Sequence, residues 1–380
     1  MSNATLRVML CDDSQAMRTS LARLLESDPI IRIIAQVGDG EAALRVLETM
    51  PPAQQPDVIL LDLEMPVMDG MTALPLLLAR RPRPVVIVAS ALTQRGASQA
   101  MAALRAGAAD YLPKPSTAMG GLRDSAFQAE LLAKVKGWAR IGRQPDLPLT
   151  RPGAVAGLQP RAIAIGASTG GPQALAQFVK RLPRQLHLPV LITQHMPAGF
   201  TAMLAQHLNG LGGPSCSEAR DGEALRPGHI LIAPGNHHMI LRRADFGAVH
   251  VQLSADPPEN FCRPAVDPML RSLATIYGRG LLAIILTGMG QDGLLGCQAV
   301  ARAGGTVLAQ DEAALWSGAC PAPWPGPAWR SFSPPPRPWP NLFWPPCGKP
   351  HEPGNLPVSR GHGEAALGWR AHGQSGLYAA

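Results

Sequence analysis

Three aspartates follow two apolar runs near the N-terminus of the sequence. Asp12 and Asp13 come shortly after residues 6–10, and Asp62 comes directly after residues 58–61. Since the carboxyl ends of parallel strands meet at one edge of a sheet, we expect these side chains to converge there. Clustered carboxylates repel one another unless a hard cation neutralises them, and Mg²⁺ takes oxygen ligands of this kind. The spacing therefore predicts a magnesium site.

Two more polar residues follow the next two apolar runs. Ser90 comes after residues 85–89, and Lys114 comes shortly after residues 109–112. A hydroxyl and an ammonium group beside carboxylates and Mg²⁺ suit a transferred phosphoryl group, whose oxygens need donors and positive charge. Each residue alone could be an ordinary loop residue at a strand end. All of them in order, at successive strand ends, predict a centre that accepts phosphate.

A serine, a histidine and an aspartate follow three strands of the second half of the chain. Ser168 lies in the small-residue turn ASTGGP, His195 follows residues 190–194, and Asp292 lies in GMGQDG. A serine at the N-terminus of a helix can present its hydroxyl beside backbone N–H groups that stabilise an oxyanion. His195 would take the proton from Ser168, and Asp292 would hold the imidazole in the right tautomer. The three residues predict nucleophilic hydrolysis.

The turn around Ser168 has two rival interpretations. A glycine-rich turn before a helix can also cradle a phosphate. However, the segment has neither a Walker lysine nor a GxGxxG pattern, which argues against nucleotide binding. It also lacks the GxSxG sequence of the α/β-hydrolase nucleophile elbow.

Short apolar runs alternate with amphipathic stretches in both halves of the chain, which predicts two α/β domains, each with a doubly wound parallel sheet. The first occupies residues 1–122 and the second residues 159–314. Between them, residues 123–158 are richer in Gly, Pro and Arg and predict a linker with one possible helix over 126–141. In the second domain, Val266–Tyr277 has helical apolar spacing, and residues 238–241 and 249–253 predict a hairpin.

Composition and charge exclude several classes of protein. No apolar run of about 18 residues is present to span a bilayer, and the first residues lack a secretory signal pattern. We therefore expect a cytoplasmic protein without membrane insertion. The six cysteines lack the spacing of a zinc site or a disulfide framework. Most of the positive charge excess lies in residues 123–158 and 315–380, so we expect no nucleic-acid binding by the two domains.

The motifs CDDS, LLDLEMPVMDG, VASALT and YLPKP resemble the receiver domain of two-component response regulators over about 115 residues. The resemblance implies a flavodoxin-like fold in which Asp62 accepts phosphate from the phosphohistidine of a sensor kinase. It implies that Ser90 and Lys114 report the phosphorylated state. It also implies that Mg²⁺ is held by four groups, namely Asp12, Asp13, Asp62 and the backbone carbonyl of Glu64.

The second domain carries IGASTGGPQAL, ITQHMPAGFTAMLA, LIAPGNHHMIL, RPAVDPMLRSLA and LTGMGQDGLLG, which resemble the CheB-type protein-glutamate methylesterases of bacterial chemotaxis. The resemblance implies a Rossmann-like domain that hydrolyses γ-glutamyl methyl esters on chemoreceptors, releasing methanol, and commonly deamidates receptor glutamines. Ser168, His195 and Asp292 would be the nucleophile, the base and its aspartate, and no metal would be needed for hydrolysis. Thr169 and Met289 would shape the oxyanion region, and phosphorylation of the receiver would relieve inhibition.

Two other functions remain compatible with parts of this pattern. A response regulator with a binding-only output would need a helix-turn-helix or a concentrated basic face, and neither is visible. A catalytically impaired receiver-methylesterase-like protein could instead only dock on receptors. Methanol release from a methylated receptor distinguishes these functions.

The last 66 residues, 315–380, differ in composition from the rest of the sequence. They contain 14 of the 39 prolines and six of the seven tryptophans. Regrouping the codons by one base can restore a family-like segment directly after Ala314. We therefore interpret this tail as translated out of frame and expect it to be disordered. The catalytic domain would then be incomplete at its C-terminus and of low stability. A genuine proline-rich extension is the alternative.

Sequencing the gene on both strands tests the frameshift. We expect a one-base insertion or deletion near codon 314, whose correction restores the family-like segment. An unbroken reading frame on both strands would refute the interpretation.

Overall fold

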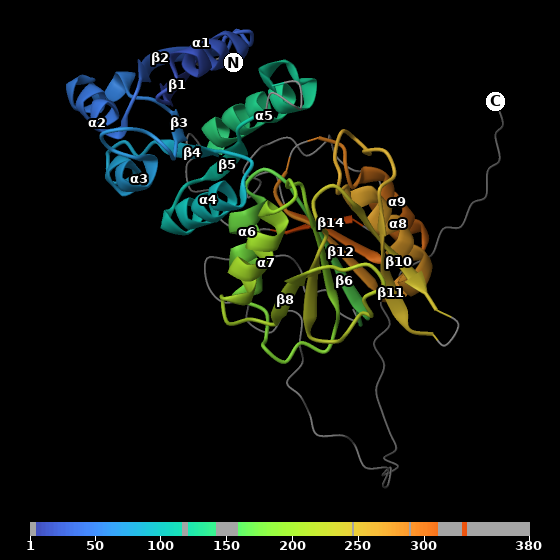
Figure 1. The fold of residues 1–380 in the computed structure, drawn as a ribbon. Coiled ribbons are helices and arrows are strands. Elements are labelled where there is room, and N and C mark those ends of the chain that lie inside the picture. Colours follow the sequence, from blue (N-terminus) through green and yellow to red (C-terminus); the bar gives the residue numbers. More distant parts are fainter. Residues whose placement is uncertain are drawn as a thin grey trace, which may run out of the picture. The chain divides into compact units, whose positions relative to one another are not determined.

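The structure is a computed structural model that describes residues 5–115, 121–141, 159–244, 247–288, 290–310 and 329–332. Two parallel sheets with flanking helices dominate these residues (Figure 1). None of the described helices is long and apolar enough to cross a membrane. The predicted fold class, two parallel-sheet α/β domains, is confirmed.

The first sheet has five parallel strands in the order β2-β1-β3-β4-β5. Its strands are β1 (Leu6–Cys11), β2 (Ile31–Val37), β3 (Val58–Asp62), β4 (Val85–Ser90) and β5 (Asp110–Pro113). The strand order reverses between β1 and β3, so the loops after these two strands border one crevice at the carboxyl edge. The acidic residues predicted to bind Mg²⁺ follow these strands.

Helices connect the strands of the first sheet and cover it. They are α1 (Gln15–Leu25), α2 (Gly40–Thr49), α3 (Gly70–Leu78) and α4 (Gln94–Ala106), with 3₁₀ turns at Pro52–Gln54 and Gly121–Arg123. Each α-helix begins after a residue whose side chain accepts a hydrogen bond from the first turn: Ser14, Asp39, Asp69 and Thr93. Such caps satisfy backbone N–H groups that have no partner inside the helix. The caps thus fix where each loop at the carboxyl edge ends.

Helix α5 (Ser125–Ile141) lies within the residues predicted as a linker. Phe127, Leu131, Val135 and Trp138 are buried at helical spacing, and they join the apolar core that α1 forms with the first sheet. A helix whose apolar face packs in this core is part of the first domain. The remaining predicted linker residues, 142–158, lie outside the described residues.

The second sheet has seven parallel strands in the order β14-β13-β12-β6-β7-β9-β8. Its strands are β6 (Ala162–Ala167), β7 (Val190–Gln194), β8 (Ser215–Glu218), β9 (His229–Ile232), β12 (Leu281–Ile285), β13 (Thr306–Gln310) and β14 (Trp329–Phe332). The chain moves from β6 to β7 on one side and returns to β12 on the other. The ends of these three strands therefore border the crevice of this sheet.

The remaining elements of the second domain cover its sheet. They are the helices α6 (Gly171–Val179), α7 (Phe200–Asn209), α8 (Val266–Tyr277) and α9 (Leu294–Arg302), the 3₁₀ turn Gly278–Gly280, and the antiparallel hairpin β10 (His238–Arg243) and β11 (Val249–Ser254). Figure 1 shows α8 and α9 side by side, with α8 against β10. Met269, Leu270 and Leu273 of α8 are fully buried in this layer, as their helical spacing predicts.

Strand β14 pairs in parallel with β13 and belongs to the predicted out-of-frame tail. These four residues, Trp329–Phe332, are the only part of the tail among the described residues, and they form a strand, whereas the sequence predicts disorder. Parallel pairing with β13 supplies backbone hydrogen bonds without requiring an apolar pattern in the added strand. The predicted frameshift point near Ala314 lies outside the described residues.

Candidate functional site

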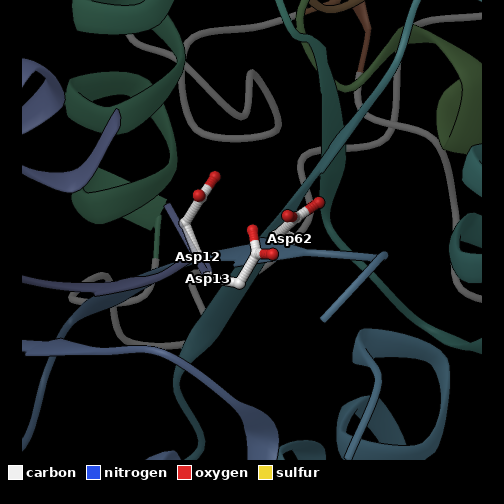
Figure 2. Close-up of side chains that lie close together, drawn as sticks. All are labelled: Asp12, Asp13 and Asp62. Atoms are coloured by element: carbon white, nitrogen blue, oxygen red, sulfur yellow. The ribbon is translucent and has the colours of Figure 1, made fainter. Parts of the chain in front are cut away.

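The structure brings Asp12, Asp13 and Asp62 together at the crevice of the first sheet. One carboxylate oxygen of each lies within 4.8 Å of the others, and Figure 2 shows the three side chains as a group. Asp12 and Asp62 are buried, whereas Asp13 is exposed. Three carboxylate oxygens at this spacing, one of them open to solvent, fit a hard divalent cation that retains several water ligands.

Lys114 lies between two of these carboxylates. Its Nζ is 2.8 Å from Asp12 Oδ2 and 2.6 Å from Asp62 Oδ2. Burial raises the pKa of the Asp62 carboxyl, and the hydrogen bond from Lys114 offsets this only in part. Burial lowers the pKa of Lys114, but its hydrogen bonds to Asp12 and Asp62 leave that pKa above its ordinary value. The ammonium group therefore remains charged beside Asp62.

Ser90 ends strand β4, which pairs with β3 so that Ala89 lies opposite Asp62. Its side chain is 2% exposed, and its Oγ has no hydrogen-bond partner within the described part of the chain. A buried hydroxyl without a partner is costly, so this donor fits an acceptor delivered to the site from outside. Glu64 lies two residues after Asp62, and its backbone N–H donates to Asp62 Oδ1 over 3.2 Å.

The loop after Asp62 returns directly onto the strand that it leaves. The backbone N–H of Gly70 donates to Leu63 O over 3.2 Å. A Cβ at position 70 would collide with the carbonyl oxygen of Asp62. Only glycine permits this close approach, which explains Gly70 at the start of α3.

Ser168, His195 and Asp292 meet at the crevice of the second sheet. His195 Nδ1 lies 3.1 Å from Ser168 Oγ, and His195 Nε2 lies 2.7 Å from Asp292 Oδ2. In the neutral imidazole with its proton on Nε2, donated to Asp292, the lone pair of Nδ1 faces the serine hydroxyl. The order serine, imidazole, carboxylate is the one needed to activate a nucleophile.

Asp292 is fixed by the start of helix α8. Its Oδ2 accepts a hydrogen bond from the backbone N–H of Val266 over 2.6 Å, and its Oδ1 accepts one from Asp267 over 3.2 Å. Burial raises the pKa of this carboxyl, but the hydrogen bond from His195 and the two backbone N–H groups hold it below its ordinary value. Asp292 is therefore an anion that holds the imidazole.

Gln194, which the sequence analysis did not single out, connects the two loops that carry Ser168 and His195. Its Nε2 donates to Ser168 O over 2.8 Å and approaches His195 O at 3.3 Å. The side chain packs against Gly171, where a Cβ would collide with its amide. The only feature of the sequence that could have indicated a role for Gln194 is its position directly before His195 in ITQHMP.

Cys262 is a second neighbour of the imidazole that the sequence analysis missed. Its Sγ lies 3.4 Å from His195 Nδ1. Burial lowers the pKa of His195, but Cys262 and the hydrogen bond to Asp292 outweigh it and raise the pKa to about 10. The sequence could not indicate this contact, because Cys262 lies 67 residues from His195 in a loop without a regular pattern.

Of the two residues predicted to shape an oxyanion region, only Thr169 lies within the described residues. Thr169 directly follows Ser168, is buried, and its carbonyl oxygen accepts a hydrogen bond from Thr287 Oγ1 over 2.8 Å. Met289 lies outside the described residues.

Comparisons with known proteins agree with this division of the chain. Residues 8–123 match the model of the response regulator receiver domain, and residues 163–321 match that of the CheB methylesterase family. The chain is 48% identical over 337 residues to the protein-glutamate methylesterase/protein-glutamine glutaminase of Azospirillum brasilense, with 81% of this chain and 84% of the relative covered. It is 45% identical over 339 residues to protein-glutamate methylesterase/protein-glutamine glutaminase 1 of Paramagnetospirillum magneticum, with 81% and 87% covered.

Among solved structures, the CheB methylesterase catalytic domain of Thermotoga maritima is 40% identical, with a TM-score of 0.41, and the match covers 43% of this chain and 85% of that one. The identity and coverage of the two relatives, together with the two matched family models, establish the family. This chain belongs to the CheB methylesterases, which combine a response-regulator receiver domain with a methylesterase domain.

Proposed function

We propose that this chain is a protein-glutamate methylesterase that hydrolyses γ-glutamyl methyl esters of chemoreceptors and also deamidates receptor glutamines. The main support is the series of contacts from Ser168 Oγ through the His195 imidazole to the Asp292 carboxylate. It is supported by the names of the two relatives. A protein that only docks on receptors would not need this arrangement, so catalysis is the better supported function.

Ser168 Oγ attacks the ester carbonyl carbon while its proton passes to His195 Nδ1. The imidazolium is stabilised by Asp292, and the proton is returned to the departing methoxide, so methanol leaves and an acyl-serine remains. Water then attacks the acyl carbon, with His195 again taking and returning the proton, and releases the glutamate carboxylate. A glutamine amide follows the same two steps with ammonia as the leaving group. We assign stabilisation of the oxyanion to the region of Thr169 and Met289.

In the first domain, Asp62 is the proposed acceptor of phosphate from a sensor histidine kinase. Its carboxylate oxygen attacks the phosphorus atom of the phosphohistidine, the P–N bond breaks, and the imidazole of the kinase leaves. Lys114 and the hydroxyl of Ser90 bind the oxygens of the resulting acyl phosphate. Mg²⁺ bound by Asp12, Asp13, Asp62 and the Glu64 carbonyl would neutralise the phosphoryl charge. Phosphorylation is proposed to activate the methylesterase, and a cytoplasmic location follows from these partners.

Ser168→Ala tests the nucleophile. We expect methanol release from methylated receptor to fall by about 10⁴-fold or more, because Ser168 carries the one hydroxyl that contacts His195 among the described residues. Ser215→Ala is the matched control, since Ser215 Oγ also contacts a histidine, His229 Nδ1 at 2.6 Å, away from the proposed site. Methanol release that survives Ser168→Ala, or that is lost in Ser215→Ala, would contradict the assignment.

Asp62→Asn tests the phosphoacceptor. We expect no incorporation of radioactive phosphate from a phosphorylated histidine kinase in the presence of Mg²⁺, because the amide cannot form the acyl phosphate. Asp39→Asn is the control, since Asp39 caps α2 and asparagine caps helices equally well. Persistent labelling of the Asp62→Asn protein would refute the assignment.

The pKa of His195 predicts the pH dependence of hydrolysis. The imidazole must be neutral to take the proton of Ser168, so activity rises with pH toward the pKa of about 10. Cys262→Ala removes one neighbour that raises this pKa, so we expect its profile of kcat/KM against pH to rise at lower pH. Cys216→Ala, on β8, leaves the profile in place. An unchanged or more alkaline profile for Cys262→Ala would contradict the role of the sulfur.

A further inference from the structure

A tight turn with an unusual sequence borders the catalytic histidine. Glu259 and Cys262 exchange two backbone hydrogen bonds, of 3.2 and 2.9 Å, and enclose Asn260 and Phe261. Both central residues have positive φ, 51° and 63° respectively. Two such residues in succession define a type I′ turn, which favours the sequence Asn-Gly. Asn260 suits this turn, whereas phenylalanine is a poor residue for its second position.

The turn is anchored to the catalytic residues on both sides. The guanidinium of Arg271 donates to both carboxylate oxygens of Glu259, over 2.5 and 2.9 Å. Asn260 Nδ2 lies 3.4 Å from Asp292 Oδ1, and Cys262 Sγ lies 3.4 Å from His195 Nδ1. The position of residue 261 is therefore fixed relative to the base and its aspartate.

Phe261 buries little of its surface against the described residues. Its side chain is 87% exposed, and it is the only aromatic among the large apolar side chains that remain exposed in the described ranges. Strained backbone conformations cluster at functional sites, where the strain has a use. Cys262 touches the atom that receives the serine proton, so the turn that carries Phe261 borders the catalytic histidine.

We propose that Phe261 is a specificity-determining contact for the protein substrate, and this inference rests on the proposed methylesterase function. A glutamyl side chain is short, so the receptor segment that carries the ester must approach the rim of the site before its carbonyl reaches Ser168. Apolar side chains next to the modified glutamate then pack on the Phe261 ring. An aromatic anchor on a rigid turn loses little conformational entropy when it binds, which favours this use.

Phe261→Gly separates this role from a structural one. The variant creates the Asn-Gly sequence that the turn prefers, so we expect its melting temperature to stay equal or rise. With the full chain, Mg²⁺ and a phosphodonor present, kcat/KM for methylated receptor should fall about 5- to 30-fold, mainly through KM. The rate with a small substrate, the γ-methyl ester of N-acetylglutamate amide, should remain within about two-fold, since it has no flanking residues to reach the ring. Leu76→Ala, at an exposed apolar position on α3, is the control and should change neither rate.

The outcomes are distinct. An equal loss with both substrates would mean that residue 261 acts on the catalytic residues, and no loss with either would mean that the ring contacts nothing; both overturn the inference. Absence of hydrolysis of both substrates by the unaltered chain would instead refute the proposed function itself.

Discussion

The carboxylate of Asp292 is the interaction on which the catalytic geometry depends. It accepts hydrogen bonds from the His195 imidazole after β7 and from two backbone N–H groups at the start of α8, and it belongs itself to the loop after β12. One anion thus joins three segments that are far apart in the sequence. The helix N-terminus keeps that anion charged, and the anion in turn decides which imidazole nitrogen faces Ser168. Without this carboxylate, Nε2 of the histidine would lose the hydrogen bond that sets its tautomer.

The two domains use the same construction for different chemistry. In each, a parallel sheet reverses its strand order, and the side chains that follow the strands on either side of the reversal meet in one crevice. In the first crevice the residues are acidic and a lysine bridges two of them, which suits phosphate and a divalent cation. In the second, a hydroxyl, an imidazole and a carboxylate stand in line. The fold places the residues, and only their chemical types decide the reaction.

The sequence was sufficient for residues that directly follow strands. The acidic cluster and the Ser168–His195–Asp292 group could be predicted to converge because each member lies at or shortly after the end of a strand of a parallel sheet, Asp292 in the loop that follows β12. Gln194, Cys262 and Asn260 could not, because their roles depend on the path of loops and on contacts with residues far away in the chain. Helix α5 was assigned to a linker for a similar reason: its pattern indicated a helix, but only the core shared with α1 shows where it belongs. Strand β14 has no sequence signal of its own and depends on pairing with β13.

The packing of Gln194 against Gly171 limits how this site can change during evolution. A side chain at position 171 requires the amide of Gln194 to move, and a displaced amide no longer bridges the carbonyls of Ser168 and His195. A larger residue at position 171 or a smaller one at position 194 therefore weakens this bridge. The loop that carries Ser168 and the loop that carries His195 are thus linked through Gln194, so a substitution in one loop restricts the substitutions that the other accepts.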